Sequence, residues 1–398
     1  MTDSPALTLE EAQARVLALA PAMPVKRVAA TEAVGRYLAE DLVARRAQPS
    51  ADLSAMDGYA LCGVGSWRIV GESRAGAPFD SKLMWGQCVR ISTGAHMPAG
   101  ADRVLIREEA ELLQPDLVTV SHDIPPGQHV RKCGFDFAEG DKVLAAGTRI
   151  GPAQLALAIS AGHGQLPVRR APRVAVLDSG DELAADPADC GDHQIPASNG
   201  AMIAAMLGAL GCEVLRIGPV ADDAEALAAA LEQAEGADIL VTSGGASVGD
   251  HDLIRPALEA WGARIDFWKV AMKPGKPVMV ATRGTQVILG LPGNPVSSFV
   301  TCFHFVMPLV RAAMGASMPV PRKAMLVCGT ELPAIGGRRE FLRAAWDGTS
   351  ATLVDSQDSS ALASLAAANC LIDRPAGSEM VEAGTSVPAY LLENGGIA

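Results

Sequence analysis

The chain has 398 residues, of which 49% are hydrophobic, and this apolar content suffices for the cores of about two to four domains. Its formal net charge of −12 excludes non-specific nucleic-acid binding, which depends on Lys and Arg to neutralise phosphates. The eight cysteines are scattered without a Cys-x-x-Cys pair, and this excludes a zinc site of that kind and a disulfide framework. We therefore expect reduced thiols in a soluble cytoplasmic protein.

The N-terminal third predicts a helix followed by a β-rich module. Thr8 and Glu11 form a capping box ahead of an Ala- and Leu-rich stretch that predicts a helix up to Ala20. From about residue 49 to residue 145, short alternating runs between glycines and prolines predict strands. Ala153 to Ala161 then predicts another helix.

Residues 171–318 alternate between strand and helix patterns. Strands are expected at 173–177, 213–217 and 238–242, and helices at 199–210 and 222–234. This order predicts a mostly parallel sheet with helices on both faces. A hairpin is expected at 277–281 and 286–289.

A long apolar helix follows, with Asn294 as its N-cap and Pro295 at its first position. Its stretch 296–310 is shorter than the ~20 residues that span a membrane, so we expect a buried helix and no membrane partner. After the prolines at 319 and 321, short strands return and indicate a small β-barrel or sandwich.

The most informative segment is 243–249, Ser-Gly-Gly-Ala-Ser-Val-Gly, which follows the third strand of the α/β part. Ligands bind such sheets beyond the carboxyl ends of the strands. Free backbone N–H groups next to a helix N-terminus suit a phosphate. Asp250 and Asp252 stand where a divalent metal could bridge them to it. No Lys follows the glycines, so this is not the nucleotide P-loop.

The same segment also matches the Gly-x-Ser-x-Gly elbow of serine hydrolases, with Ser247 as the nucleophile. That alternative requires an acid and a histidine downstream, for which Asp266 and His304 are available. Because His304 lies in an apolar helix pattern, we expect it in the core, and the phosphate interpretation is favoured.

Three further segments carry polar side chains to the same region. Glu182 closes the first strand of the α/β part and could reach a shared ligand or metal. Lys273 and Lys276 stand in a proline-fixed loop that predicts an oxyanion site. The segment 291–297, Leu-Pro-Gly-Asn-Pro-Val-Ser, combines a rigid turn with a helix N-terminus, another geometry that binds anions.

Taken together, seven segments resemble the molybdopterin molybdenumtransferases, enzymes that insert molybdenum during cofactor synthesis. The matching segments are 54–60 (Ser-Ala-Met-Asp-Gly-Tyr-Ala), 93–102, 179–183, 198–200, 243–249, 272–277 and 291–297. They cover nearly the whole chain in the family's order. One departure is Phe135, which replaces an acid, whereas the neighbouring Asp136 remains.

The resemblance implies a multidomain α/β and β architecture. It consists of a discontinuous N-terminal domain (1–48 and 141–170), an inserted β-rich module (49–140), a mostly parallel α/β molybdopterin-binding domain (171–318) and a C-terminal β-barrel (319–398). It also implies an elongated homodimer whose site is shared between subunits, so that Asp57, Thr93 and Asp136 face the partner chain. Molybdopterin adenylyltransferase is a further implied partner.

The implied reaction joins molybdate to the dithiolene of adenylylated molybdopterin and releases AMP with the help of Mg²⁺. The metal would be held by Glu182, Asp250 and Asp252. Asp57, Asp136, Glu182 and Asp252 would be the catalytic residues. The substrate-binding residues implied in the same way are Thr93, Ser243, Gly244, Gly245, Ser247, Lys273, Lys276, Pro292, Pro295, Ser297, Arg343 and Ser359.

Two other functions stay open at this point. Molybdopterin adenylyltransferase shares the α/β domain and its glycine loop, but the ~250 residues around that domain favour the insertion enzyme. A non-catalytic scaffold uses the same domain set in animals, but the retained lysines, Asp57 and the acidic residues favour catalysis. The sequence does not distinguish molybdate from tungstate.

Overall fold

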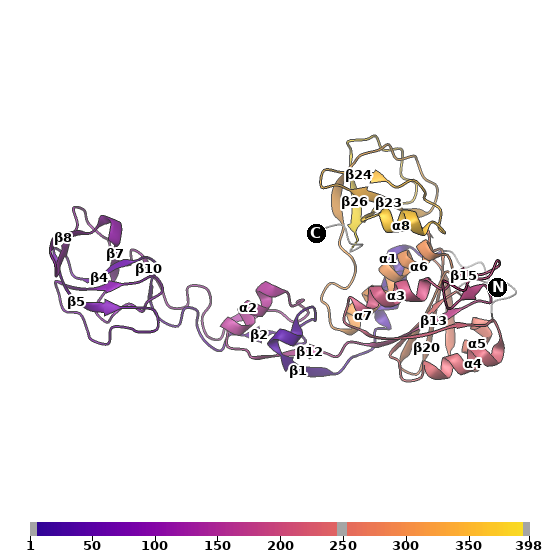
Figure 1. The fold of residues 1–398 in the computed structure, drawn as a ribbon, viewed down its shortest axis with the longest axis horizontal. Helices are drawn as coiled ribbons and strands as arrows, with labels where there is room; N and C mark the ends of the chain where they lie inside the picture. Colours follow the sequence, from indigo (N-terminus) through magenta and orange to yellow (C-terminus); the bar gives the residue numbers. More distant parts are fainter. Residues whose placement is uncertain (1–5, 245–252, 393–398) are drawn as a thin grey trace.

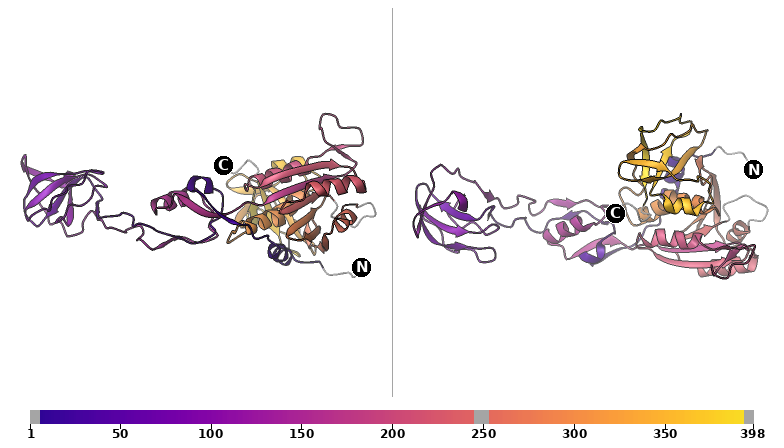
Figure 2. Two further views of the ribbon diagram at one scale, coloured as in Figure 1. Left: turned by 90° about the horizontal axis from the view of Figure 1, so that it is seen from below. Right: turned by 45° about the horizontal axis from the view of Figure 1, so that its top comes forward.

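The computed structural model describes residues 6–244 and 253–392, and the described parts form an elongated molecule (Figure 1). The module that contains β4 to β9 lies at one end, and the α/β domain and the barrel lie together at the other (Figures 1 and 2). The predicted multidomain α/β and β architecture is confirmed.

The slender middle part is built from segments on both sides of the module. Its strands pair antiparallel, β1 with β12 and β2 with β11, so the chain returns beside itself after the module. A small core that includes Leu38, Ile150 and Leu166 holds these segments together. The elements are β1 (Val25–Ala29), the 3-10 helix Ala30–Ala33, β2 (Leu42–Val43), β11 (Lys142–Leu144), α2 (Pro152–Ser160) and β12 (Gln165–Arg169).

The module is a six-stranded sheet in the order β7-β4-β6-β5-β9-β8, with a separate two-stranded pair, β3–β10. Two small cores, around Trp67 and around Val89, lie within it. Its strands are β3 (Leu53–Ser54), β4 (Gly58–Cys62), β5 (Trp67–Ser73), β6 (Gln87–Ile91), β7 (Arg103–Ile106), β8 (Glu111–Gln114), β9 (Leu117–Thr119) and β10 (Val130–Arg131).

The α/β domain has a sheet in the order β16-β13-β17-β21-β20-β18. The pairings among β16, β13, β17 and β21 are parallel, whereas β20 pairs antiparallel with both β21 and β18, and β20 and β21 form the expected hairpin. The strands are β13 (Arg173–Ser179), β16 (Glu213–Val220), β17 (Ile239–Ser243), β18 (Arg264–Lys269), β20 (Pro277–Arg283) and β21 (Gln286–Leu291), with a short pair β14 (Leu183–Ala184) and β15 (Ile195–Pro196) beside them.

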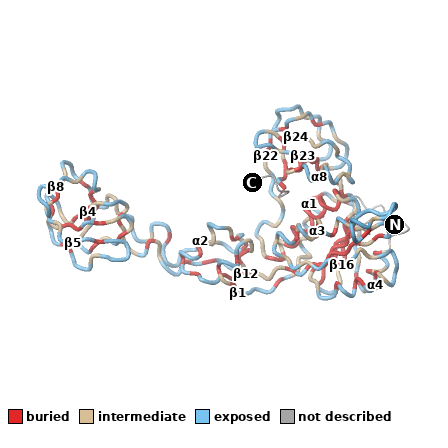
Figure 3. The backbone as a smooth tube through the Cα atoms, in the orientation of Figure 1, coloured by how far each residue is buried: buried red, intermediate tan, exposed pale blue. Residues whose placement is uncertain are grey.

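Alternate residues of the buried strands serve two different cores, because successive side chains of a strand point to opposite faces. Val174 and Val176 pack on the side of the helices α1, α3, α6 and α7, whereas Ala175 and Leu177 pack on the side of α4 and α5. Figure 3 shows this domain as the most continuously buried part of the molecule. The helices are α1 (Leu9–Ala18), α3 (Asn199–Gly208), α4 (Ala224–Gln233), α5 (Ile254–Ala260), α6 (Pro295–Thr301) and α7 (Met307–Ala313).

The apolar helix between Pro295 and Ala313 is a core helix. By length and composition it would suffice to cross a membrane, but 89% of its apolar window is buried inside the fold. A π-helical segment, Cys302–Val306, interrupts it between α6 and α7. Asn294 is the N-cap and Pro295 the first helical residue, as predicted, but the Asn294 side chain makes no capping bond, because its amide donates to Ser359 Oγ at 3.0 Å.

The C-terminal part is a barrel in the order β19-β23-β24-β22-β26-β25, closed by a pairing of β23 with β25. The elements are β19 (Met272–Lys273), β22 (Ala324–Cys328), β23 (Arg339–Trp346), β24 (Ser350–Leu353), α8 (Leu362–Ala367), β25 (Cys370–Arg374) and β26 (Ser386–Leu391). Its first strand comes from the α/β part: Met272 and Lys273 pair with Arg339 and Glu340. The predicted lysine loop therefore lies at the junction between the two domains.

Candidate functional site

A cavity of about 560 Å³ opens between the lysine loop and the barrel, and we call it the anion cavity. Four separate segments of the chain meet around it. Its lining residues are Met272, Lys273, Pro274, Gly275, Lys276, Ser297, Arg338, Gln357, Asp358 and Ser359. Four residues that the sequence assigned to one oxyanion site therefore line one space: Lys273, Lys276, Ser297 and Ser359.

Backbone contacts fix the walls of the anion cavity. Gly275 has φ +98°, and a Cβ there would lie 2.6 Å from Thr301 Cγ2, so the lysine loop passes α6 at a distance that only glycine permits. On the opposite wall, the Val296 N–H donates to the Ser359 carbonyl at 3.0 Å. The bond from the Asn294 amide reaches the hydroxyl of the same serine. These contacts join the start of α6 to the barrel.

The charged side chains around the anion cavity differ in whether another protein group already compensates their charge. Lys273 Nζ lies 3.3 Å from the Glu340 carboxylate, which compensates its charge. Lys276 and Arg338 are exposed at the cavity. The Asp358 carboxylate accepts the Ser360 hydroxyl and N–H, and these bonds hold the pKa of Asp358 below its usual range. Two available cations beside two serine hydroxyls suit a small tetrahedral oxyanion, which binds through charge-assisted hydrogen bonds.

Arg338 is the residue that the sequence reasoning missed, and Arg343 is placed differently from the expectation. Arg343 is 1% exposed and lies behind the wall, where its guanidinium donates to the Ser356 carbonyl at 2.9 Å. It is not among the residues that line the cavity. The signal for Arg338 was present as a glycine pair followed by two arginines at 336–339.

A second group lies at the carboxyl ends of β13 and β17. Ser243 is buried there, and the Gly244 N–H donates to the Leu291 carbonyl at 3.0 Å. Pro292 and Pro295 are half-buried in the neighbouring turn. Four predicted residues, Gly245, Ser247, Asp250 and Asp252, lie outside the described residues. The phosphate loop is thus described only at its first two positions.

The carboxylates of Asp181, Glu182 and Asp222 lie near one another, shortly after the ends of β13 and β16. The Asp222 N–H donates to Asp181 Oδ1 at 3.0 Å. Burial, then the charges of Asp181 and Glu182, raise the pKa of Asp222. Carboxylate oxygens are the ligands that Mg²⁺ prefers. A bound cation would also relieve the repulsion between neighbouring carboxylates. Within 6–244 and 253–392, however, no three His, Cys, Asp or Glu side chains are arranged to hold a metal. The neighbouring Asp223 is the N-cap of α4.

Asp178 is a buried carboxylate behind the same loop. It is 3% exposed and pairs with Ser243 in the register of β13 and β17. A Cβ at Gly200 would lie 1.9 Å from Asp178 Oδ2, so glycine is required where α3 begins. Burial raises the pKa of Asp178 to about 6, although Arg216, the Gly200 N–H and the Ser243 hydroxyl oppose that effect.

Asp178→Asn is expected to stabilise the protein above pH 6. Because the folded-state pKa lies above the ordinary value, folding takes up a proton, and stability falls as pH rises from about 4 to 6. The neutral amide avoids this loss, worth ~3 kcal/mol. Thermal unfolding should therefore show a midpoint roughly 5 °C higher at pH 8 and little change at pH 4. Asp347→Asn is the control of opposite sign, because backbone hydrogen bonds lower the pKa of Asp347. Equal shifts of Asp178→Asn at both pH values would contradict the prediction.

The third group lies on the module. Asp57 Oδ1 accepts the Thr93 N–H at 2.7 Å and the Thr93 hydroxyl at 3.1 Å, and these bonds lower the pKa of Asp57. Asp136 is exposed between the module and the middle part, where it lines a cavity of about 410 Å³ together with residues of β11 and α2. Phe135 is 74% exposed beside it. Within one chain, the module lies at the end opposite to the anion cavity (Figure 1).

His304 is a core residue, as its apolar surroundings predicted. It is fully buried, and its ring centroid lies 4.3 Å from that of Phe341 and 5.0 Å from that of Tyr390. Burial lowers the pKa of His304 to about 3. It therefore has neither the access nor the basicity that the serine-hydrolase alternative requires.

Comparisons with known proteins agree with this architecture. Residues 7–162 match the model of the MoeA N-terminal region (domains I and II), 175–312 match a probable molybdopterin binding domain, and 326–392 match the MoeA C-terminal region (domain IV). A molybdopterin molybdenumtransferase of Haemophilus influenzae is 35% identical over 345 residues, 85% of each chain. One of Bacillus subtilis is 32% identical over 411 residues, 98% of this chain and 95% of the relative.

A solved structure has the same fold. The crystal structure of the molybdopterin biosynthesis MoeA protein from Pyrococcus horikoshii OT3 superposes with a TM-score of 0.84 at 26% identity and covers 97% of this chain and all of the other. The matched regions follow one another in the same order as in those relatives. With its lysine loop, anion cavity and inserted module, this chain belongs to the MoeA family of molybdopterin molybdenumtransferases.

Proposed function

We propose that this enzyme joins molybdate to the dithiolene of adenylylated molybdopterin and releases AMP. The observation that carries the proposal is the anion cavity, in which Lys276, Arg338 and two serine hydroxyls surround a space of about 560 Å³. A tetrahedral dianion offers an acceptor to each of these donors. The proposal explains why the cations gather where the α/β domain meets the barrel.

The second group would bind the nucleotide side of the substrate. Ser243 and Gly244 begin the loop that we propose as the phosphate site, and the loop continues outside the described residues. Glu182 would hold Mg²⁺ together with Asp250 and Asp252, which also lie outside them. When bound, the metal would neutralise charge on the pyrophosphate and so favour its cleavage. The protein's own part is to place the dithiolene of this substrate next to the molybdate.

The separation of the module from the anion cavity supports a homodimer with shared sites. Asp57 and Thr93 are exposed and hydrogen-bonded to each other, and the module to which they belong lies at the far end of the molecule from the α/β domain and the barrel (Figure 2). A second copy would bring its module to that cavity. Exposed apolar residues on the middle part suit such an interface: Val25, Val34, Val43 and Ile159. Molybdopterin adenylyltransferase would be a cytoplasmic partner that supplies the adenylylated substrate.

The test is AMP release by purified protein given adenylylated molybdopterin, Mg²⁺ and molybdate. We expect release that requires molybdate, stops when a chelator removes Mg²⁺ and returns when Mg²⁺ is restored. Adenylylation of molybdopterin from ATP in the same tubes would instead support the adenylyltransferase. Absence of both reactions from folded protein would support a scaffold. Competition between molybdate and tungstate in this assay would establish the anion preference.

A further inference from the structure

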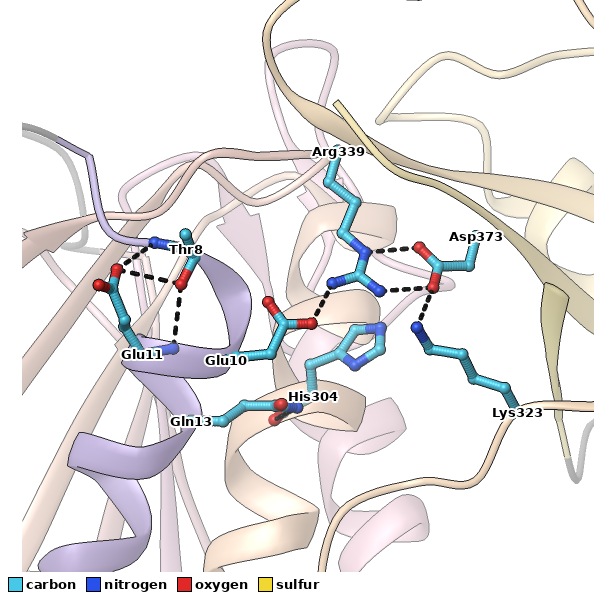
Figure 4. A network of polar contacts seen from close by, with 8 residues as sticks. All are labelled: Thr8, Glu10, Glu11, Gln13, His304, Lys323, Arg339 and Asp373. Atoms are coloured by element: carbon cyan, nitrogen blue, oxygen red, sulfur yellow. Dashed lines mark hydrogen bonds and ion pairs between the residues drawn. The ribbon is translucent and has the colours of Figure 1, made fainter. Parts of the chain in front are cut away.

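Four charged side chains join four segments of the chain, and we call them the junction cluster (Figure 4). Its members are Glu10 of α1, Lys323 before β22, Arg339 of β23 and Asp373 of β25. The Arg339 guanidinium donates to both oxygens of Asp373 and to Glu10. Lys323 Nζ lies 2.7 Å from the same Asp373 carboxylate.

The junction cluster is largely buried and its charges are balanced. The Asp373 side chain is fully buried, and the Arg339 side chain is 11% exposed. Burial would raise the pKa of Asp373, but the hydrogen bonds from Arg339 and Lys323 outweigh it and hold that pKa below its usual range. Because His304 is neutral, two cations face two anions. Removing one partner would leave a buried charge uncompensated, which is strongly destabilising.

Arg339 stands between two charged residues that act on the anion cavity in different ways. Arg338, before it, lines the cavity, and Glu340, after it, compensates Lys273. The Arg339 N–H donates to the Ala271 carbonyl at 2.9 Å, where β23 pairs with the start of the lysine loop. Arg339 thus ties the junction cluster to the backbone before the lysine loop and to the backbone that carries Arg338.

The N-terminal segment pairs with the backbone that precedes the lysine loop. The Leu7 N–H donates to the Lys269 carbonyl, and the Ala271 N–H donates to the Leu7 carbonyl, both at 2.8 Å. The capping box between Thr8 and Glu11 then fixes the start of α1, from which Glu10 reaches Arg339 (Figure 4). Residues 7–11 therefore pair with the backbone before the lysine loop and also supply the outer anchor of Arg339.

We infer that Arg339 is a positioning residue for the anion cavity: held by Glu10 and Asp373, it fixes the backbone that carries Arg338 and Glu340. The inference rests on the proposed function for the identity of the anion. A small shift of this backbone would move the Arg338 guanidinium and the Glu340 partner of Lys273 together. Anion affinity then depends on a residue that is not among those lining the cavity.

The test measures the Kd of molybdate by calorimetry on the full-length protein, beside AMP release. We expect Arg339→Gln to raise the Kd and the KM for molybdate about tenfold, with kcat and the KM for adenylylated molybdopterin within about twofold of native. Arg339→Lys, which keeps the charge, should recover part of the affinity. Glu10→Gln removes only the exposed anchor of Arg339 and should raise the Kd for molybdate about twofold to threefold. This variant tests the inference even if Arg339→Gln does not fold.

Arg170→Gln is the matched control. Arg170 forms a comparable two-pronged pair with Asp238, with both distances 2.9 Å, before the start of β17 and away from the cavity. It should lower the thermal midpoint without changing the Kd for molybdate. Native affinity in both Arg339→Gln and Glu10→Gln, or equal weakening by Arg170→Gln, would overturn the inference. If native protein binds molybdate but releases no AMP, the proposed reaction fails while the ratio of Kd values still decides the role of Arg339.

Discussion

Lys276→Met is expected to lower kcat/KM for molybdate by about 100-fold, because a charge-assisted contact to a dianion is worth ~3 kcal/mol. Lys276 is exposed at the anion cavity, in a loop held by Gly275 against α6. Methionine keeps much of the length of the side chain and removes only its charge and donors. The measurement is AMP release over a range of molybdate concentrations.

Lys273→Met should have a smaller effect, about tenfold, because the charge of Lys273 is already compensated by Glu340. The matched control is Lys82→Met, an exposed lysine on the module whose loss should leave the kinetics unchanged. The prediction would be contradicted if Lys276→Met kept the native KM for molybdate, or if Lys273→Met were the more damaging variant. Either outcome would show that Lys276 is not the main cationic contact of the anion.

The local features of the fold were predictable from the sequence because short-range chemistry decides them. The capping box at Thr8 and Glu11 is present, with the Glu11 N–H donating to the Thr8 hydroxyl at 3.2 Å. The alternation of strands and helices predicted the parallel sheet correctly. The predicted hairpin also formed, as β20 and β21. In each case the signal lies within a few residues of the structure that it specifies.

Features that depend on contacts between distant segments were not predictable in the same way. Asn294 has the sequence of a helix cap, but its amide bonds Ser359, which is 65 residues away. The pairing of β19 with β23, which brings Arg338 to Lys276, also joins two domains. The π-helical segment at 302–306 was not predicted, because an apolar pattern indicates a buried helix and does not specify how that helix is wound.

The same reason explains what was missed in the candidate site. Motif resemblance assigned Lys273, Lys276, Ser297 and Ser359 to one anion, and the structure places them around one cavity. It did not predict Arg338 or the junction cluster, since Glu10 and Arg339 are 329 residues apart in the sequence. Resemblance to a family assigns a role only to residues that lie within a shared motif. It gives no account of the ion pairs that hold those residues in place.

A dimer with one subunit carrying Asp57→Asn and the other Lys276→Met is expected to regain about half of the native activity. If each site combines the anion cavity of one subunit with the module of the other, both substitutions fall in the same site. The second site then contains native residues from both chains. Each variant alone should form an inactive homodimer, because both of its sites are damaged.

The experiment co-expresses the two variants with different affinity tags and purifies the mixed dimer through both. A mixed dimer of Lys276→Met with Arg338→Gln is the control, because both changes alter the same half of the site and damage both sites. That dimer should stay inactive. If the site lay within one chain, Asp57→Asn and Lys276→Met would each damage one complete site, and their mixed dimer would also be inactive. Recovery in the first mixture alone therefore distinguishes a site shared between subunits from one confined to a single chain.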